Sequence, residues 1–294
     1  MPKVGVVIPC YNLGQYLMEA LNSVLRQTLR DVEVVIVDDG STDKLSEEVL
    51  DSIDDSRVTL IRTENRGPSA ARNTGVKNTT AEYIVCLDAD DCLDPTYLEK
   101  TARILDEDRG SILGFVSTFI KMFGERDEII PIHQYSKHRL AFANQTHVAS
   151  MFRKRCWEEV GGYYEDEILY FEDWFFWLSM VVRGYKWVTI EEPLFCYRVR
   201  GGSRFTVLDA NRHLLYSKMV ARYPRFFLEG LIAWWPAALL GITRKYFKVA
   251  GKLITADDYR VWNALSDMRN FEILAPFERF RAVFQAFLKV MCSN

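Results

Sequence analysis

The sequence predicts an α/β fold with a mainly parallel central sheet flanked by helices, followed by a helical C-terminal region. Over the first 120 residues, short apolar runs alternate with helical segments, a pattern typical of repeated βα units. Beyond residue 205 the strand-like runs stop, and the chain reads as helices rich in aromatic and basic residues. A chain of 294 residues is long enough to bury a large core.

Four strands and four helices are expected in the first part of the chain. The strands are short apolar runs: Val4 to Pro9, Val32 to Val37, Val58 to Ile61 and Tyr83 to Leu87. The helical segments follow them in alternation: Gly14 to Gln27, Leu45 to Ile53, Ser69 to Lys77 and Pro95 to Leu105. Ligands bind at the carboxyl ends of the strands in such sheets, so the polar residues that follow each strand are candidate site residues.

The next part of the chain is less regular. Residues 112–120 form a further apolar run, and residues 124–147 are polar and irregular enough to be an excursion over the sheet. Residues 148–197 are compact and aromatic, with a turn at Gly161-Gly162 and a buried helix from Asp173 to Val182. This pattern indicates that the same domain continues to about residue 200.

A domain boundary is expected near Gly201-Gly202-Ser203. It separates residues 1–204, with halves 1–110 and 111–204, from a helical region of residues 205–294. The charge also changes there: residues 1–204 hold 24 basic and 33 acidic side chains, whereas residues 205–294 hold 13 and 7. We therefore expect the two parts to face different partners.

The cysteines and the termini indicate the compartment. The six cysteines, at positions 10, 86, 92, 156, 196 and 292, show no paired C-x-x-C spacing, so we expect reduced thiols and neither disulfides nor a zinc site. No signal peptide precedes the first strand, and no apolar stretch reaches the roughly 18 residues of a spanning helix. A cytoplasmic location is expected, with contact at the inner face of the membrane as an open alternative.

The fourth expected strand ends on acids, because Asp88, Asp90 and Asp91 follow Leu87 within four positions. Carboxylates this close repel one another, and a hard divalent cation such as Mg²⁺ or Mn²⁺ would hold them ionised together. That cation would also neutralise a phosphorylated ligand. The alternative is a solvated acidic turn that caps the next helix.

Polar clusters also follow the first two strands, around Tyr11 and Asp39. The ring of Tyr11 can stack on a flat base, and the carboxylate of Asp39 can accept from a ring N–H or a ribose hydroxyl. Alternatively, Asp39-Gly40-Ser41 is only a turn before a helix cap. Three polar clusters after three strands favour a binding site, since turns alone need no convergent acids.

Two further segments carry candidate chemistry. Between the third and fourth strands, Arg66 and Arg72 lie near a glycine and the start of a helix. This combination suits a diphosphate or its ribose; a capped surface helix is the alternative.

Farther on, aromatic residues surround Glu172-Asp173. Desolvation should raise the pKa of such a carboxylate and make it a better proton acceptor, whereas the alternative is a helix N-terminal acid pair.

Together these segments resemble the family 2 glycosyltransferases of the GT-A fold, which are inverting enzymes that use nucleotide-diphosphate sugars. The matching segments recur in the family's order within residues 3–204: Val6 to Asn12, Val37 to Asp43, Asn65 to Gly75, Leu87 to Asp91, Gly161 to Tyr163, and Glu172-Asp173. The resemblance implies metal-dependent transfer of a sugar to a hydroxyl acceptor, with a UDP-sugar as the expected donor. Polysaccharide (including cell-envelope polysaccharide), glycolipid or other glycoconjugate synthesis is the implied setting.

The resemblance also implies roles for single residues. In the nucleotide-binding half, 1–110, the residues that hold the nucleotide sugar would be Pro9, Tyr11, Asp39, Asn65, Arg72, Asp88 and Ala89. Asp90 would ligate the Mn²⁺ or Mg²⁺ that bridges the diphosphate. In the acceptor half, 111–204, Asp173 would be the general base, with Glu172 and Trp174 on the acceptor side.

One position departs from the family pattern. Where the family often has Tyr-Arg-x-His, this chain has Tyr197-Arg198-Val199-Arg200. Arginine cannot act as a neutral metal ligand, but it binds phosphate in a bidentate way. We therefore expect Arg198 or Arg200 to close over the diphosphate.

Other classes of protein stay open: a nucleotide-sugar-binding subunit without catalysis, or a nucleotidyltransferase. Asp90 together with Asp173 argues against the first, and the Glu172-Asp173 pair argues against the second. The expected acceptor is a saccharide or a lipid-linked molecule, and nucleic acid is not an expected partner. Residues 205–294 suit a membrane interface or, alternatively, packing on the catalytic domain or homodimerisation.

Overall fold

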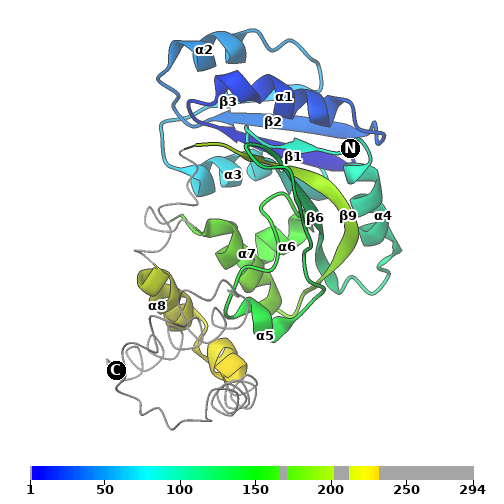
Figure 1. Ribbon diagram of the computed structural model, residues 1–294, viewed down its shortest axis with the longest axis vertical. Coiled ribbons are helices and arrows are strands. Elements are labelled where there is room, and N and C mark those ends of the chain that lie inside the picture. Colours follow the sequence, from blue (N-terminus) through cyan, green and yellow to red (C-terminus); the bar gives the residue numbers. More distant parts are fainter. Residues whose placement is uncertain (1, 166–170, 202–211, 232–294) are drawn as a thin grey trace, which may run out of the picture. The chain divides into compact units, whose positions relative to one another are not determined.

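The computed structural model describes residues 2–165, 171–201 and 212–231 (Figure 1). Contacts group the chain into two compact units, Met1–Ser136 with Asn144–Leu208, and Lys137–Ala143 with Asp209–Asn294. The sheet lies in the first unit. The second unit contains α5 (Lys137–Leu140), α8 (Arg212–Arg222) and a helical stretch at 224–231.

The first four strands form a parallel sheet in the order β3-β2-β1-β4. Their bounds are β1 Val4–Cys10, β2 Val32–Asp38, β3 Val58–Arg62 and β4 Tyr83–Cys86. The connecting helices are α1 Gly14–Leu25, α2 Lys44–Asp51 and α3 Pro68–Lys77. Figure 1 shows α1 and α2 on one face of these strands and α3 on the other. The expected alternation of strands and helices is therefore confirmed.

Beyond β4 the sheet is mixed, in the order β4-β8-β6-β9-β5, with β7 paired to β6. The bounds are β5 Cys92–Leu93, β6 Leu113–Gly124, β7 Ile129–Ile130, β8 Met151–Arg153 and β9 Lys186–Val199. β8 is antiparallel to both of its neighbours, whereas β6 and β9 are parallel to each other. Wholly parallel pairing is thus confined to β3, β2, β1 and β4. Strand β8 follows the irregular segment expected at 124–147 and runs antiparallel to β4 and β6.

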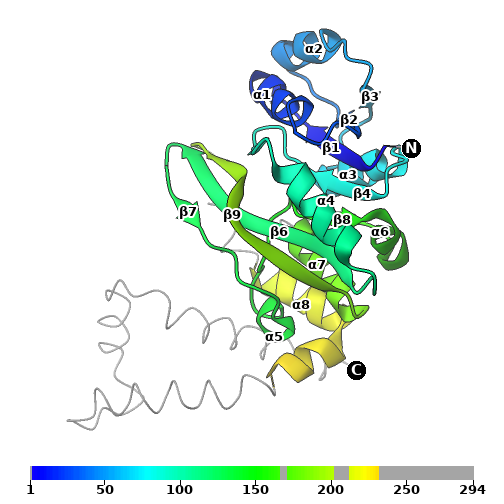
Figure 2. The same cartoon turned by 90° about the vertical axis from the view of Figure 1, so that its right-hand side faces the viewer.

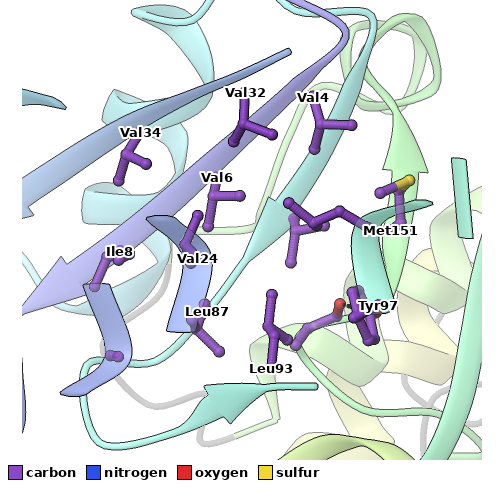
Figure 3. Packing of buried hydrophobic residues seen from close by; sticks show 14 of the residues in the cluster. Val4, Val6, Ile8, Val24, Val32, Val34, Leu87, Leu93, Tyr97 and Met151 are labelled. Carbon is purple, nitrogen blue, oxygen red and sulfur yellow. Dashed lines mark hydrogen bonds between the residues drawn. The ribbon is translucent and has the colours of Figure 1, made fainter. Parts of the chain in front are cut away.

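One hydrophobic core lies between α1, α4 (Tyr97–Glu107) and one face of the sheet. Successive residues of a strand face opposite sides, so alternate residues of β1 and β2 supply this core. Figure 3 shows them together with residues of α1, α4 and neighbouring strands: Val4, Val6, Ile8, Val24, Val32, Val34, Leu87, Leu93, Tyr97 and Met151. The core fixes β1, β2 and β4 in register, which in turn fixes the positions of the residues that follow them.

Aromatic rings bury the opposite face of β6 and β8 against α7 (Glu172–Val182), which follows α6 (Lys154–Val160); Figure 2 shows these elements from the side. Phe115 of β6 stacks on Trp177 with ring centroids 4.5 Å apart. Phe152 of β8 meets Phe176 edge to face at 5.1 Å. Aromatic pairs of this kind add about 0.5–1.5 kcal/mol each beyond area burial. They hold the N-terminus of α7 at a defined place on the sheet.

Several expected boundaries move by one or two residues, among them both ends of the second helix, which spans Lys44–Asp51 and not Leu45 to Ile53. The fourth expected helix begins at Tyr97 and not at Pro95, because the side chain of Asp94 accepts hydrogen bonds from the N–H and hydroxyl of Thr96 and forms a turn first. The expected helix from Asp173 begins at Glu172. The predictions for residues 205–211 and 232–294 lie outside the described residues.

In the described part of the chain, no helix is long and apolar enough to cross a bilayer. The five cysteines described there are free thiols: Cys10, Cys86, Cys92, Cys156 and Cys196. Burial raises the pKa of Cys10 to about 11 and that of Cys86 to about 12, so these thiols are un-ionised at neutral pH. Cys292 lies outside the described residues.

Candidate functional site

The acidic segment lies directly beyond β4, as expected. Asp88 and Asp90 are half-buried, and Asp91 is buried. The strand β5 follows at once, and Cys92 pairs with Cys196 of β9. This pairing brings the end of β9 beside the acids, so one site is built from segments that are distant in the sequence.

Arg72 of α3 joins the acidic segment to α7. Its Nη2 donates to Oδ1 of Asp88 at 2.6 Å, and its Nη1 donates to Oε1 of Glu172 at 2.7 Å. The Arg72 side chain is only 3% exposed, and a guanidinium buried this deeply needs carboxylate partners. From the sequence, Arg72 is expected to hold the nucleotide. In the structure both terminal nitrogens are engaged by protein, so a contact with a nucleotide would pass through Asp88.

Arg198 fastens the acidic segment to the end of β9. Its backbone N–H donates to Oδ1 of Asp91, and its Nε donates to the carbonyl oxygen of Asp90, both at 2.8 Å. Its Nη2 pairs with Glu19 of α1 at 2.5 Å. The guanidinium is thereby occupied on two sides. Arg198 holds the loop in place, although the sequence analysis names it as a candidate for the diphosphate.

Arg200 contacts the candidate metal ligand directly. Its Nε donates to Oδ2 of Asp90 at 2.8 Å, and the guanidinium lies 5.5 Å from the ring centroid of Tyr16. Among the described residues, this is the only hydrogen bond of the Arg200 side chain. Of the two arginines expected at the diphosphate, Arg200 therefore has the less occupied guanidinium.

Asp91 points inward, away from this surface. It is 1% exposed, and burial together with the charges of Asp88 and Asp90 raises the pKa of its carboxyl group well above the usual range. Its contact with the backbone of Arg198 makes it an acceptor for β9. Asp91 is thus a structural member of the acidic segment.

The expected base, Asp173, lies in the first turn of α7. Its Oδ2 accepts from Nδ2 of Asn144 at 2.8 Å, and its Oδ1 accepts from the backbone N–H of Trp174 at 2.7 Å. Burial and the neighbouring charge of Glu172 raise the pKa of Asp173 from 3.8 to about 6. A carboxylate with this pKa is mostly ionised at neutral pH and accepts protons better than an ordinary aspartate.

Glu172 and Trp174, expected on the acceptor side, flank Asp173 and are both buried. The carboxylate of Glu172 is committed to Arg72, and Trp174 is 3% exposed. Asp173 is the half-buried member of the three. It is therefore the side chain of this turn that has the most access to an acceptor.

The residues expected at the nucleobase differ in exposure. Tyr11 is 41% exposed and Asn65 is exposed, whereas Pro9 and Ala89 are buried in or beside the sheet. The loop that carries Tyr11 is fixed by its neighbour Asn12, whose Oδ1 accepts from the backbone N–H of Thr42 at 2.8 Å. A rigid loop with an exposed ring is suited to stacking on a base.

Asp39 holds the loop that carries Asn65. Its two carboxylate oxygens accept from the backbone N–H groups of Arg66 and Gly67, each at 2.9 Å. Gly67 has a φ of 86°, a conformation that favours glycine. Asp39 is 4% exposed, and burial raises the pKa of its carboxyl group. It thus has a structural role that the sequence analysis does not predict; contact with the base stays a prediction.

Two asparagines were missed as site residues. Asn144, the partner of Asp173, lies in the irregular segment, where no periodicity points to it. Asn73 lies inside the segment Asn65 to Gly75; its Oδ1 accepts from the N–H of Tyr163 at 2.8 Å and from Nε1 of Trp157 at 3.0 Å. Neither partner is readable from sequence spacing, because both contacts join segments far apart in the chain.

The acids fit a metal only as part of a complex with phosphate. In the described part of the chain, no three Asp, Glu, His or Cys side chains are grouped so as to enclose an ion. Asp91 faces inward, and Asp88 is paired with the buried Arg72, whereas Asp90 is paired with the partly exposed Arg200; this leaves Asp90 as the candidate ligand. Mg²⁺ is commonly bound by one or two carboxylates together with substrate phosphates and water. Asp90 fits that donor set.

Comparison with known proteins identifies the family. The profile described as Glycosyl transferase family 2 matches residues 5–162. The chain belongs to glycosyl transferase family 2. The resemblance noted in the sequence is therefore confirmed, and the chain is a glycosyltransferase.

Curated relatives of this family 2 glycosyltransferase are themselves glycosyltransferases. EpsJ of Bacillus subtilis, an uncharacterized glycosyltransferase, is 26% identical over 250 residues, which cover 78% of this chain and 72% of EpsJ. Several other relatives are much longer, and the chain spans 15 to 17% of their length.

Solved structures similar to the family 2 glycosyltransferase share its fold. S. aureus TarS 1-349 in complex with UDP-GlcNAc has a TM-score of 0.65 at 17% identity, covering 98% of this chain and 90% of that one. The mannosyltransferase PcManGT from Pyrobaculum calidifontis, in complex with GDP-Man and Mn²⁺, has a TM-score of 0.64 at 19% identity, covering 100% and 88%. The expected GT-A fold is confirmed.

Proposed function

We propose that this glycosyltransferase moves a sugar from a nucleotide-diphosphate sugar to a hydroxyl acceptor with inversion, in glycoconjugate synthesis such as that of cell-envelope polysaccharide. One observation carries the proposal: Arg72 connects Asp88, in the acidic segment, to Glu172, beside Asp173. Hydrogen bonds thus join an acid suited to a donor to the residue that precedes Asp173, the carboxylate suited to proton transfer. A UDP-sugar is the proposed donor.

On the donor side, Tyr11 stacks on the nucleobase within a pocket formed with Pro9, Asp39 and Asn65. Asp88 and Ala89 contact the nucleoside, with Arg72 orienting Asp88. Support comes from the exposure of Tyr11 and from the rigid loops around it. These residues lie in the proposed nucleotide-binding half, 1–110.

Asp90 is the proposed ligand of Mn²⁺ or Mg²⁺. When bound, the metal stabilises the departing diphosphate as a Lewis acid and orients it. The presence of GDP-Man and Mn²⁺ in the PcManGT structure supports the use of a divalent metal. Arg200, beside Asp90, is the proposed protein cation for the diphosphate; Arg198 takes part by holding the loop.

On the acceptor side, Asp173 takes the proton from the attacking hydroxyl, and the oxygen attacks the anomeric carbon opposite the leaving diphosphate. A single displacement of this kind inverts the configuration. Asn144 and the N–H of Trp174 hold the carboxylate in place, and burial together with the charge of Glu172 raises its pKa. These residues lie in the proposed acceptor half, 111–204.

Residues 205–294 are the proposed region of contact with a membrane or with a second copy of the chain. This placement fits a cytoplasmic enzyme at the inner face of a membrane. The support is the basic balance of the region, with 13 basic and 7 acidic residues. The proposed acceptor is a saccharide or a lipid-linked molecule.

The proposal is tested by a donor screen. Binding and hydrolysis of UDP-, GDP- and dTDP-sugars are measured with and without Mn²⁺, and UDP-sugars with Mn²⁺ are expected to be bound and slowly hydrolysed. If no sugar nucleotide is bound or turned over with any metal, the proposal fails.

A variant of Asp173 distinguishes an enzyme from a nucleotide-sugar-binding subunit without catalysis. Asp173→Asn should lower turnover by about 10²–10⁴-fold, the usual contribution of a general base, while donor affinity in calorimetry is unchanged. Ser179→Ala, farther along the same helix, serves as the matched control. Equal turnover in wild type and Asp173→Asn would show that Asp173 is not the general base.

A further inference from the structure

We infer that Arg200 occupies the metal-ligating carboxylate before the donor arrives, and that the metal and the nucleotide diphosphate consequently bind together. The inference rests on the proposed function, because it takes Asp90 as the metal ligand. It adds that the binding of the metal depends on the binding of the nucleotide, and it names Arg200 as the residue that couples the two.

The backbone around Arg200 is held on both sides. Before it, the N–H of Arg198 is bonded to Asp91. After it, the N–H of Gly201 donates to Oε1 of Glu125 at 2.8 Å. The position of Arg200 beside Asp90 therefore follows from the pairing of β5 with β9, and only the side chain of Arg200 has to move to release the acid.

The contact itself is easily exchanged. Arg200 reaches Oδ2 of Asp90 through Nε alone, and the two side chains are 31% and 19% exposed. Partly exposed ion pairs with one hydrogen bond are weak in comparison with buried bidentate pairs. Arg72 shows the contrast, since its two terminal nitrogens are bonded and it is 3% exposed. Of these two arginines, Arg200 is the one that a competing cation can displace.

Electrostatics makes the exchange depend on the nucleotide. A divalent cation and a guanidinium on the same carboxylate repel each other at close range. A diphosphate brings negative charge that both cations can share, and the terminal nitrogens of Arg200 suit bidentate binding of phosphate. Without nucleotide, Arg200 opposes the metal; with nucleotide, Arg200 and the metal favour each other's binding. Coupling of this kind is reciprocal.

The test measures Mn²⁺ affinity directly, by the loss of the electron paramagnetic resonance signal of free Mn²⁺. Wild type, Arg200→Gln and Arg200→Lys are titrated with Mn²⁺ alone and in the presence of UDP or GDP. Arg103→Gln, which removes an exposed arginine of α4, controls for net charge, and thermal melting verifies that each variant is folded. Asp90→Asn identifies the site.

In wild type, UDP or GDP should raise Mn²⁺ affinity. Arg200→Gln should bind Mn²⁺ alone at least about fivefold more tightly than wild type, and the gain on adding nucleotide should shrink by a similar factor. Arg200→Lys should stay closer to wild type because it keeps the charge. Arg103→Gln should match wild type.

Two other outcomes are separable. If Asp90→Asn abolishes Mn²⁺ binding but Arg200→Gln leaves affinity and coupling unchanged, the inference is wrong and the proposed metal ligand stands. If Asp90→Asn leaves Mn²⁺ binding unchanged, or if wild type binds no Mn²⁺ even with nucleotide, both the inference and the metal part of the proposed function are overturned.

Discussion

The guanidinium of Arg72 lies between two carboxylates from segments that are far apart in the sequence. Asp88 follows β4, and Glu172 begins α7. Loss of Arg72 would leave both carboxylates without this partner, and Glu172, whose side chain is 10% exposed, is poorly reached by water. The side chain is therefore important for stability as well as for the geometry of the site.

Arg72→Met should lower the free energy of unfolding by about 3 kcal/mol, at the lower end of the cost of breaking a buried ion pair because Asp88 is partly open to water. The matched control is Arg57→Met, whose pair with Asp55 at 2.8 Å has side chains 39% and 27% exposed. Its loss should cost less than about 1 kcal/mol. Urea unfolding measures both. Equal costs for the two variants would contradict the structural role assigned to Arg72.

The raised pKa of Asp173 predicts how activity depends on pH. The base must be ionised, and its pKa is about 6, so turnover should fall as the pH drops through 6 and be level above it. The pH profile of donor hydrolysis, measured as kcat/KM, is the readout. A profile that stays level down to pH 4.5 would mean that Asp173 does not act as the base or that its pKa is not raised.

The same shift predicts a dependence of stability on pH. Because the folded-state pKa of Asp173 lies above its ordinary value of 3.8, its contribution to stability is complete below pH 3.8 and is lost as the pH rises through about 6. Asp173→Asn has no such loss. Its melting temperature, relative to wild type, should therefore rise between pH 5 and pH 8. A constant difference across that range would contradict the shift.

At the scale of elements, the sequence predicts the parallel half of the sheet well and the mixed half poorly. Each of the first four strands is a mainly apolar run, and a helical segment comes before the next such run, so local pattern is enough. In the second half, β5 and β7 have two residues each and β8 has three, too few to show a period. Their pairing depends on contacts between distant segments, which periodicity does not report.

The turn between α6 and the loop toward α7 offers a test of element packing. Gly161 and Gly162 have φ of 83° and 82°, but only at Gly162 would an added Cβ meet neighbours, 2.7 Å from Oδ1 of Asn73. Gly161→Ala should cost about 1–2 kcal/mol from backbone strain alone. Gly162→Ala should cost about 1–3 kcal/mol more, because it also pushes Asn73 away from Tyr163.

Thermal and urea unfolding of the two glycine variants provide the comparison. The acidic segment is attached to α3 through Arg72, so Gly162→Ala is also expected to weaken donor binding, whereas Gly161→Ala is not. If the two variants are equally stable, the close fit between Asn73 and this turn contributes nothing to the free energy of unfolding.

At the scale of the whole molecule, the division of charge predicts binding to an anionic surface. The full chain should sediment with phosphatidylglycerol vesicles at low salt, through the basic residues of 205–294, and should remain free of phosphatidylcholine vesicles. Binding should weaken as salt is added. Absence of binding to the anionic vesicles would reject membrane contact and favour packing or dimerisation by this region.

The two-residue pairing of β5 with β9 also has a consequence for synthesis on the ribosome. A nascent chain that has emerged as far as β6 already contains every acid of the segment after β4, but not Glu172, Asp173 or Arg200. Until those residues emerge, Arg72 lacks its partner Glu172 of α7, and Asp90 lacks its partner Arg200, which follows β9. The charged cluster therefore closes late, and chaperone binding to stalled chains should fall sharply once residue 200 has left the exit tunnel.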